Sequence, residues 1–147
     1  MAQLEFITTS KLSSEEFFNY FLDFEYYPNY FPDQIKDIKI TQQNDNEIIT
    51  EEKIVFSTIV KNVISQTSLH KRISDNELVT KIVDGPAKGS IIHVICNQIE
   101  SGIKVKFVVD LKLSLKAKFL TPLIKKFYKK YLTALVLKFN TRTFREC

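Results

Sequence analysis

The last third of the chain most constrains the fold, because a strand pattern there runs into a long helix pattern. From Ile103 to Leu115 every second residue is apolar, and most residues between them are charged or polar. Such alternation is typical of a β-strand with one buried face. After a short connection, apolar residues recur at helical spacing, at Leu120, Leu123, Ile124, Phe127, Tyr131, Ala134 and Leu135. A sheet face and a helix face must bury each other here, around either a packed core or a ligand pocket.

Length and composition favour a single α+β domain over residues 1–147. The 12 Phe and 6 Tyr predict a large apolar interior. Cys96 and Cys147 do not belong to a metal-binding spacing, and the first residues lack the pattern of a secretion signal. We therefore expect a cytoplasmic protein without a metal site, which could also associate peripherally with a membrane.

The charge of the chain is strongly asymmetric. Residues 1–103 carry 9 basic and 15 acidic side chains, a net of −6, whereas residues 104–147 carry 12 basic and 2 acidic side chains, a net of +10. Lys125, Lys126, Lys129 and Lys130 fall opposite the apolar stripe of the predicted helix. This basic face suits contact with an anionic membrane or with ribosomal RNA, and an ordinary solvated helix face explains it equally well.

The element order can be followed from the N-terminus. Residues 2–9 read as a strand, and Ser13 with Glu16 forms a capping box that starts a helix near Ser14. Pro28 interrupts the helical pattern before a second short helix. Six further strands follow between polar turns, at residues 37–43, 47–57, 59–73, 78–83, 90–98 and 103–116. Short connections favour antiparallel pairing, so we expect one sheet of about seven strands and a long C-terminal helix.

Several short motifs occur in an order that resembles a known superfamily. They are Asp23, Tyr27-Pro28, Phe31-Pro32, Val83-Asp84-Gly85-Pro86, Val105-Lys106-Phe107, Leu120, Lys138-Phe139 and Arg142. The pattern resembles the START-like, or polyketide cyclase and dehydrase, superfamily, and is most similar to its coenzyme Q-binding and ribosome-association-toxin branch. This resemblance implies the helix-grip fold, in which a curved antiparallel sheet wraps around the C-terminal helix and encloses an apolar cavity.

The resemblance also implies where ligand-contacting residues lie. The helix-grip arrangement would place residues of the last strand and the long helix in the cavity, namely Phe107, Val109, Leu111, Phe127, Tyr131 and Leu135. Tyr30 and Phe31 would form a gate at the cavity mouth, although these aromatic side chains could equally cap the core. His93 would contact a ligand if its strand face is internal. The Tyr131 hydroxyl needs a polar partner, either from a ligand or from water at the rim.

Three functions follow as hypotheses. The first is a non-enzymatic binding or carrier protein for a hydrophobic small molecule, a lipid or an isoprenoid quinone, with no other cofactor. The second is an interaction protein that binds the ribosome or RNA through the basic C-terminal surface. The third is a polyketide cyclase or dehydratase, for which His93, Tyr131 and Asp110 are the available acids or bases. Neighbouring strand residues point to opposite faces, so Glu51 and Glu52 cannot form an acid–base pair.

Overall fold

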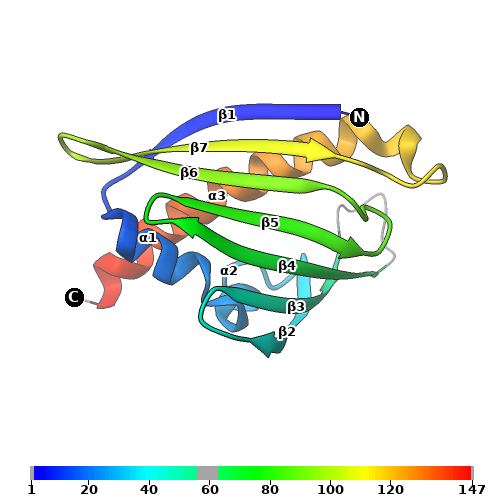
Figure 1. The fold of residues 1–147 in the computed structure, drawn as a ribbon, viewed down its shortest axis with the longest axis horizontal. Helices are drawn as coiled ribbons and strands as arrows, with labels where there is room; N and C mark the ends of the chain where they lie inside the picture. Colours follow the sequence, from blue (N-terminus) through cyan, green and yellow to red (C-terminus); the bar gives the residue numbers. More distant parts are fainter. Residues whose placement is uncertain (1, 56–62, 147) are drawn as a thin grey trace.

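The computed structural model describes residues 2–55 and 63–146, which form one curved antiparallel sheet and a long helix across its concave face (Figure 1). The strands are β1 (Ala2–Ser10), β2 (Ile35–Gln43), β3 (Glu47–Ile54), β4 (Ile64–Ser74), β5 (Glu77–Asp84), β6 (Ile91–Ile99) and β7 (Gly102–Leu111). Their order in the sheet is β1-β7-β6-β5-β4-β3-β2. Neighbouring strands are therefore consecutive in the sequence, except for the pair β1 and β7. This is the helix-grip architecture that the sequence predicted.

Helical segments lie at two places in the described part of the chain. After β1 come α1 (Ser14–Phe21), a 3₁₀ turn η1 (Phe24–Tyr26) and α2 (Tyr27–Tyr30), and after β7 come a 3₁₀ turn η2 (Lys118–Leu120) and α3 (Thr121–Glu146). The predicted capping box starts α1, because the Ser13 side chain accepts a hydrogen bond from the Glu16 amide and the Glu16 side chain accepts one from the Ser13 amide. The predicted second short helix is α2.

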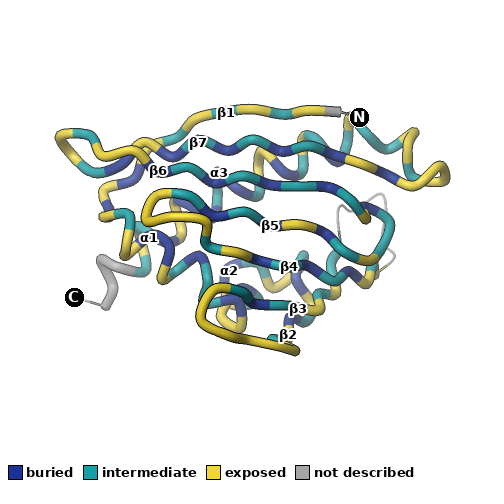
Figure 2. Tube along the Cα trace, in the orientation of Figure 1, coloured by how far each residue is buried: buried dark blue, intermediate teal, exposed yellow. Residues whose placement is uncertain are grey.

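One half of the interior is a packed core. The inward residues of β6 and β7 are apolar and fully buried beneath α3, and Phe107 also stacks on Phe6 of β1 at 5.1 Å between ring centroids. Figure 2 shows the resulting alternation of buried and less buried residues along these strands. Phe107, Val109 and Leu111 are all buried, as the alternation predicted.

The alternation overestimates the length of the last strand. β7 ends at Leu111, and the chain leaves the sheet where the Ser90 hydroxyl accepts a hydrogen bond from the Lys112 amide and donates one to the Lys112 carbonyl. Leu113 remains buried, but Leu115 is 84% exposed rather than inward-facing. The predicted strand limits at 56–57 and 59–62 lie outside the described residues.

The buried stripe of α3 is rotated from the predicted one. The most deeply buried residues are Ile124, Tyr128, Leu132, Leu135, Val136 and Phe139. Leu123, Phe127, Tyr131 and Ala134 are only partly buried, so they lie along one border of the stripe. Consequently the predicted helix residues form a side wall, and Leu132 and Tyr128 face the sheet more directly.

Candidate functional site

The other half of the interior contains a cavity of about 60 Å³, bounded by β2 to β6, the segment from α1 to α2, and α3. By the usual measure this space holds about four or five water molecules. Its apolar lining consists of Phe21, Phe24, Ile35, Ile38, Ile54, Ile82, Ile92, Phe127 and Leu132. The remaining lining residues are polar or amphipathic, namely Tyr27, Glu52, Gln66, Ser68, His70, Thr80, Tyr128 and Tyr131.

The polar lining comes from the inward faces of three adjacent strands. Glu52 on β3 pairs in register with Gln66 on β4, and His70 on β4 pairs with Thr80 on β5. Residues two apart in a strand share a face, so Gln66, Ser68 and His70 all point toward α3. The inner face of the sheet is therefore partly polar over β3 to β5, where Ile54 and Ile82 also line the cavity, and mostly apolar over β6 and β7.

Glu52 is an acidic group within this cavity. The Ser68 hydroxyl donates to its carboxylate, at 3.1 Å from Oε1 and 2.9 Å from Oε2, and the Gln66 side chain also donates to it. Removal from water outweighs these two hydrogen bonds and raises the pKa of Glu52 to about 7. No Lys or Arg is among the described residues that line the cavity, so no cation there balances an ionised Glu52.

His70 is held in the wall as a neutral imidazole. Its Nε2 lies 2.9 Å from the Thr50 hydroxyl and its Nδ1 lies 2.8 Å from the Thr80 hydroxyl. Burial lowers the pKa of His70 to about 3. Its ring also stacks on Phe24 at 4.0 Å between centroids. With both ring nitrogens engaged, His70 fixes this part of the wall and does not offer a free base.

One buried polar atom of the cavity wall lacks a partner among the described residues. The Gln66 Oε1 atom accepts no hydrogen bond there, and the residue is 7% exposed. Burial raises the pKa of Tyr128 and Tyr131, which line the cavity from α3. The Tyr27 hydroxyl donates to the Phe21 carbonyl. Buried polar groups are normally satisfied, so the Gln66 Oε1 atom marks a place for water or a ligand.

A surface groove adjoins the cavity on the outer side of α3. The groove has a volume of about 340 Å³ and is lined by residues of α3 together with Phe31 and Gln34. Phe127 and Tyr131 line both spaces, so their rings form the partition between cavity and groove. The two rings are stacked, and Phe31 packs on Tyr131 at 5.1 Å between centroids. Phe31 thus lines the groove beside Tyr131 and does not line the cavity, and its role as a gate stays a prediction.

Arg142 connects the end of α3 to the segment that closes the cavity. Its Nη1 lies 2.9 Å from Asp23 Oδ2 and donates to the Tyr30 hydroxyl at 3.1 Å, while its guanidinium covers the rings of Tyr20 and Tyr26. Tyr30 is therefore buried in this cluster rather than placed on the cavity or the groove. These contacts join the segment from Asp23 to Tyr30 to the C-terminal part of α3.

The predicted site residues separate into three groups. Phe127 and Tyr131 line the cavity and Phe31 lines the groove. Phe107, Val109, Leu111 and Leu135 are buried but belong to the packed half, because the apolar inner faces of β6 and β7 close directly onto α3. His93 faces away from α3, since its neighbours Ile92 and Val94 are the buried residues of β6.

Sequence reasoning missed Glu52, Gln66, Ser68 and His70. The inward positions of β4 are polar, whereas the outward residue Leu69 is apolar, so a search for apolar alternation assigns the faces of this strand in reverse. The sequence does contain an indication of these residues, because Gln66, Ser68 and His70 occupy every second position of one strand. Together with Glu52 on the neighbouring strand, this spacing predicts a polar patch on an otherwise apolar sheet face.

The basic residues of α3 lie where the helix pattern suggested. Lys126, Lys129 and Lys130 are exposed and Lys125 is partly exposed, and Lys126 and Lys130 also line the groove. Within residues 2–55 and 63–146, no helix combines the length and apolar character needed to span a membrane.

Comparison with solved structures places the fold clearly. A protein from Thermus thermophilus superposes with a TM-score of 0.81 at 10% identity, covering 99% of both chains. An aromatase/cyclase from a Streptomyces species gives 0.80 at 9% identity, covering 97% of this chain and 95% of that one. A START superfamily protein from Mycobacterium smegmatis gives 0.76 at 14% identity, covering 99% of both.

Similarity at these identities establishes the helix-grip fold that the chain shares with START superfamily and aromatase/cyclase structures. No family model and no curated protein matches the sequence. A shared fold does not define a function, so the chemistry of the cavity is the guide to what this protein does.

Proposed function

We propose that this protein binds and carries a small hydrophobic molecule in the cavity between the sheet and α3. The observation that supports this most is the Gln66 Oε1 atom, which is buried in a largely aromatic and aliphatic wall and has no protein partner among the described residues. Leaving such an atom unsatisfied costs about 1–3 kcal/mol. A ligand with an apolar body and a hydrogen-bonding end would recover this cost and remove apolar surface from water.

The size of the cavity limits the ligand. A cavity of about 60 Å³ is smaller than the cavity of about 150 Å³ that binds benzene, so even a one-ring ligand requires side chains of the wall to move, and a drug-sized ligand needs several hundred Å³. A lipid or an isoprenoid quinone, the ligand expected for the coenzyme Q-binding branch, would have to displace Phe127 and Tyr131 and extend into the groove of about 340 Å³. Entry through this aromatic partition is part of the proposal.

Native mass spectrometry of the gently purified protein tests this function. We expect a bound small molecule that solvent extraction releases, or uptake of an added one. Ile92→Phe and Leu132→Phe each place a larger side chain in the cavity and should reduce occupancy. Ile95→Phe is the matched control, because Ile95 lies on the opposite face of β6. A wild-type protein that carries nothing and takes up no hydrophobic molecule would contradict the proposal.

A second candidate function is proton transfer on a bound carbonyl compound, and Glu52 favours it. The predicted acids His93 and Asp110 do not line the cavity, and Asp110 accepts a hydrogen bond from Gln3 at the surface. Glu52 does line it, with a pKa of about 7 that suits both acid and base forms. Its carboxylate would take a proton from the carbon beside a ligand carbonyl, and its acid form would return one to the same carbon.

Acetophenone, a one-ring ketone, is a suitable probe of this chemistry. We expect the wild-type protein to accelerate exchange of its methyl hydrogens with deuterium from solvent, measured by NMR, and Glu52→Gln to abolish the acceleration. Glu51→Gln is the control, because Glu51 is exposed on the other face of β3. Exchange at the rate of buffer alone would leave binding as the only function.

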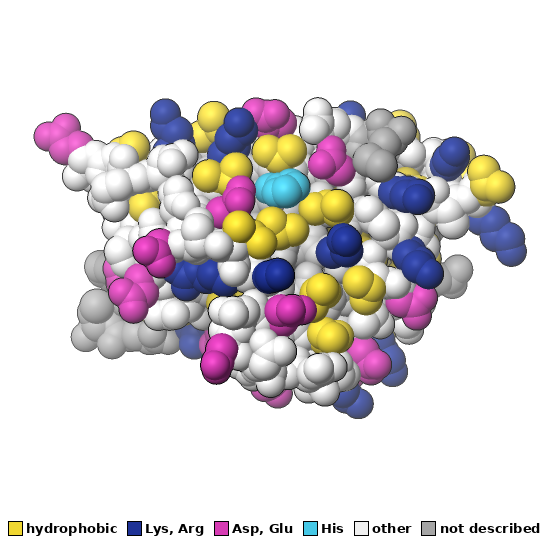
Figure 3. Space-filling view, viewed as in Figure 1, with side chains coloured by type: hydrophobic (Ala, Val, Ile, Leu, Met, Phe, Trp, Pro, Cys, Tyr) yellow, Lys and Arg dark blue, Asp and Glu magenta, His cyan; other side chains and the backbone are white. Residues whose placement is uncertain are grey.

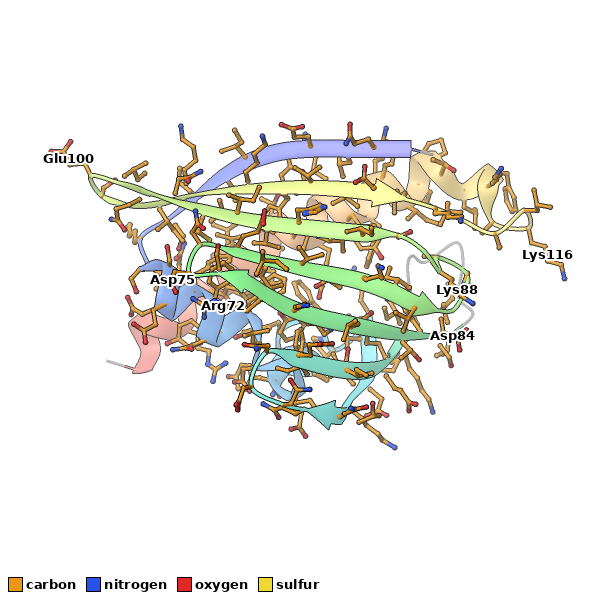
Figure 4. The ribbon with its side chains drawn as sticks, viewed as in Figure 1. Arg72, Asp75, Asp84, Lys88, Glu100 and Lys116 are labelled. Atoms are coloured by element: carbon orange, nitrogen blue, oxygen red, sulfur yellow. The ribbon has the colours of Figure 1, made fainter. Side chains whose placement is uncertain are left out.

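Transient contact with an anionic membrane is part of the carrier proposal. Leu115 is 84% exposed and Phe119 is 78% exposed, and they alternate with Lys116 and Lys118 in the connection to α3. Figure 4 shows Lys116 at one end of the molecule with Lys88 at the same end, and Figure 3 shows hydrophobic and basic side chains side by side there. Apolar side chains beside cations suit a lipid surface.

Vesicle co-sedimentation separates this contact from RNA binding. We expect binding to vesicles of phosphatidylcholine and phosphatidylserine and weaker binding to phosphatidylcholine alone. The double change Leu115→Ser with Phe119→Ser should remove binding, whereas Leu137→Ser, at an exposed site on α3, should not. If the double variant binds vesicles normally, or if single-stranded RNA binds more tightly than the vesicles, the membrane contact is refuted.

A further inference from the structure

We propose that the polar end of the ligand is a protonated amine, which Glu52 and Gln66 hold inside a surround of aromatic side chains. This inference rests on the ligand-binding function proposed above and identifies the class of ligand. It follows from the hydrogen-bonding capacity of the wall, the absence of a balancing cation among the described lining residues and the composition of that lining.

The sheet side of the cavity has hydrogen-bond acceptors that receive too few hydrogen bonds from the described residues. The two Glu52 oxygens together receive hydrogen bonds only from the Ser68 hydroxyl and the Gln66 amide among the described residues, although an ionised carboxylate has about four acceptor positions. The Gln66 amide is committed to Glu52, and its Oε1 atom receives nothing. These acceptors belong to directly paired residues of β3 and β4. A ligand group with several N–H donors complements them, and an ammonium group has three.

The charged and titratable groups around Glu52 provide no counter-ion within the described part of the wall. β4 contributes His70, which is neutral and bonded to Thr50 and Thr80. The segment from η1 to α2 contributes Tyr27, and α3 contributes Tyr128 and Tyr131. Burial raises the pKa of all three tyrosines above the usual value, so they are neutral. The described lining contains neither Lys nor Arg. A buried carboxylate is costly unless a cation pairs with it, so a cationic ligand is the partner that the described part of the wall lacks.

The rest of the wall also suits a cation. Six of the described lining residues are Phe or Tyr, namely Phe21, Phe24, Tyr27, Phe127, Tyr128 and Tyr131. The negative faces of aromatic rings attract ammonium groups, by about 2 kcal/mol when the pair is removed from water. The same rings accommodate the apolar body of the ligand. Together with the small volume of about 60 Å³, this composition favours a compact amine whose apolar body is no larger than about one ring.

Binding of an amine should be coupled to the ionisation of Glu52. Without a ligand, burial holds the pKa of Glu52 at about 7, so the carboxyl is largely protonated in mildly acidic solution. An ammonium ligand favours the carboxylate and displaces that proton. The affinity for an amine should therefore increase as the pH rises through about 7, while the affinity for a neutral ligand should not.

Three probes of similar shape test the inference, namely benzylamine, benzyl alcohol and toluene. Calorimetry at about pH 8 should give an affinity for benzylamine at least about tenfold higher than for benzyl alcohol, the contribution expected of hydrogen bonds to a charged group. In mildly acidic solution, benzylamine binding should release protons, detected as heats that depend on the ionisation enthalpy of the buffer.

The variants assign the preference to Glu52 and Gln66. Glu52→Gln should remove the preference for benzylamine but retain binding of toluene, and Gln66→Leu should reduce the preference. Glu51→Gln, on the exposed face of β3, should leave it unchanged.

Equal or tighter binding of benzyl alcohol by the wild-type protein would overturn the inference and leave the binding function standing. If the purified protein carries a natural ligand, a basic nitrogen in its composition supports the inference and its absence refutes it. A protein that carries nothing and binds none of the three probes would refute the binding function as well.

Discussion

The ring of Phe127 lies almost parallel to the ring of Tyr131, with 5.5 Å between centroids and 6° between planes, and this pair separates the cavity from the surface groove. A stacked aromatic pair contributes about 0.5–1.5 kcal/mol beyond its buried area. If ligands pass between these rings, the barrier to exchange includes that contribution.

Phe127→Ala should therefore accelerate ligand exchange. We expect the dissociation rate constant of a cavity ligand to rise by about tenfold, equivalent to about 1.4 kcal/mol, in stopped-flow measurements. Phe119→Ala removes an exposed ring outside the groove and serves as the control. Unchanged rates in Phe127→Ala would show that ligands enter by another route.

Phe139 should be among the most important residues for stability. It is fully buried, and its ring contacts those of Phe17, Tyr20, Phe21 and Tyr30 at 5.4–6.3 Å between centroids. Phe139→Ala should lower the free energy of unfolding by about 3–5 kcal/mol in urea titrations. Leu137→Ala, at an exposed position two residues away, should change it by less than about 0.5 kcal/mol. If both variants lost similar free energy of unfolding, the packing of α3 against α1 described above would be wrong.

Glu52 should destabilise the ligand-free protein at alkaline pH. Its pKa is raised to about 7 in the folded state, above the usual value of 4.5, so folding favours the protonated form. The stability that this difference provides is complete below about pH 4.5 and is lost as the pH rises through 7. Glu52→Gln should consequently be more stable than wild type by up to about 3 kcal/mol at about pH 8 and nearly equal in acid. A difference in stability that does not vary with pH would contradict the assigned pKa.

His70 should act in the opposite direction. Its pKa is lowered to about 3 in the folded state from 6.5, so the unfolded chain binds a proton that the folded protein does not. Stability from this group is complete above about pH 6.5 and declines as the pH falls toward 3. Subtracting the curve of stability against pH for His70→Gln from that of wild type should reveal this decline. The carboxylates of the protein contribute equally to both curves, so their contribution cancels. A flat difference curve would mean that the pKa of His70 is the same in the folded and unfolded chains, which would contradict the lowered value.

The sequence allowed the architecture to be predicted because the periodicities and caps that specify it are local. The Ser13–Glu16 capping box, the alternation through Leu111 and the order of strands all appear in the fold. Asp23 and Arg142, noted only as separate motif residues, prove to be an ion pair with 2.9 Å between Nη1 and Oδ2. Their contact depends on the packing of α3 against η1, which no local pattern contains.

The cavity could be predicted only in part, because its position depends on polar residues that face inward. Phe127 and Tyr131 were found from helical spacing, but Glu52, Gln66 and His70 interrupt the apolar face that periodicity searches for. Leu115 illustrates the opposite failure, since the alternation continues after the hydrogen bonds of β7 have ended and the side chain is exposed. Local pattern identifies which residues are apolar, and tertiary contacts decide where they face.

NMR of the isoleucine methyl groups tests the central claim most directly. Ile35, Ile38, Ile54, Ile82 and Ile92 line the cavity, whereas Ile7, Ile73 and Ile95 lie outside it. Titration with benzylamine or toluene should shift the methyl signals of the first group and leave those of the second unchanged. Shifts confined to the second group, or no shifts with any hydrophobic probe, would contradict a ligand site between the sheet and α3.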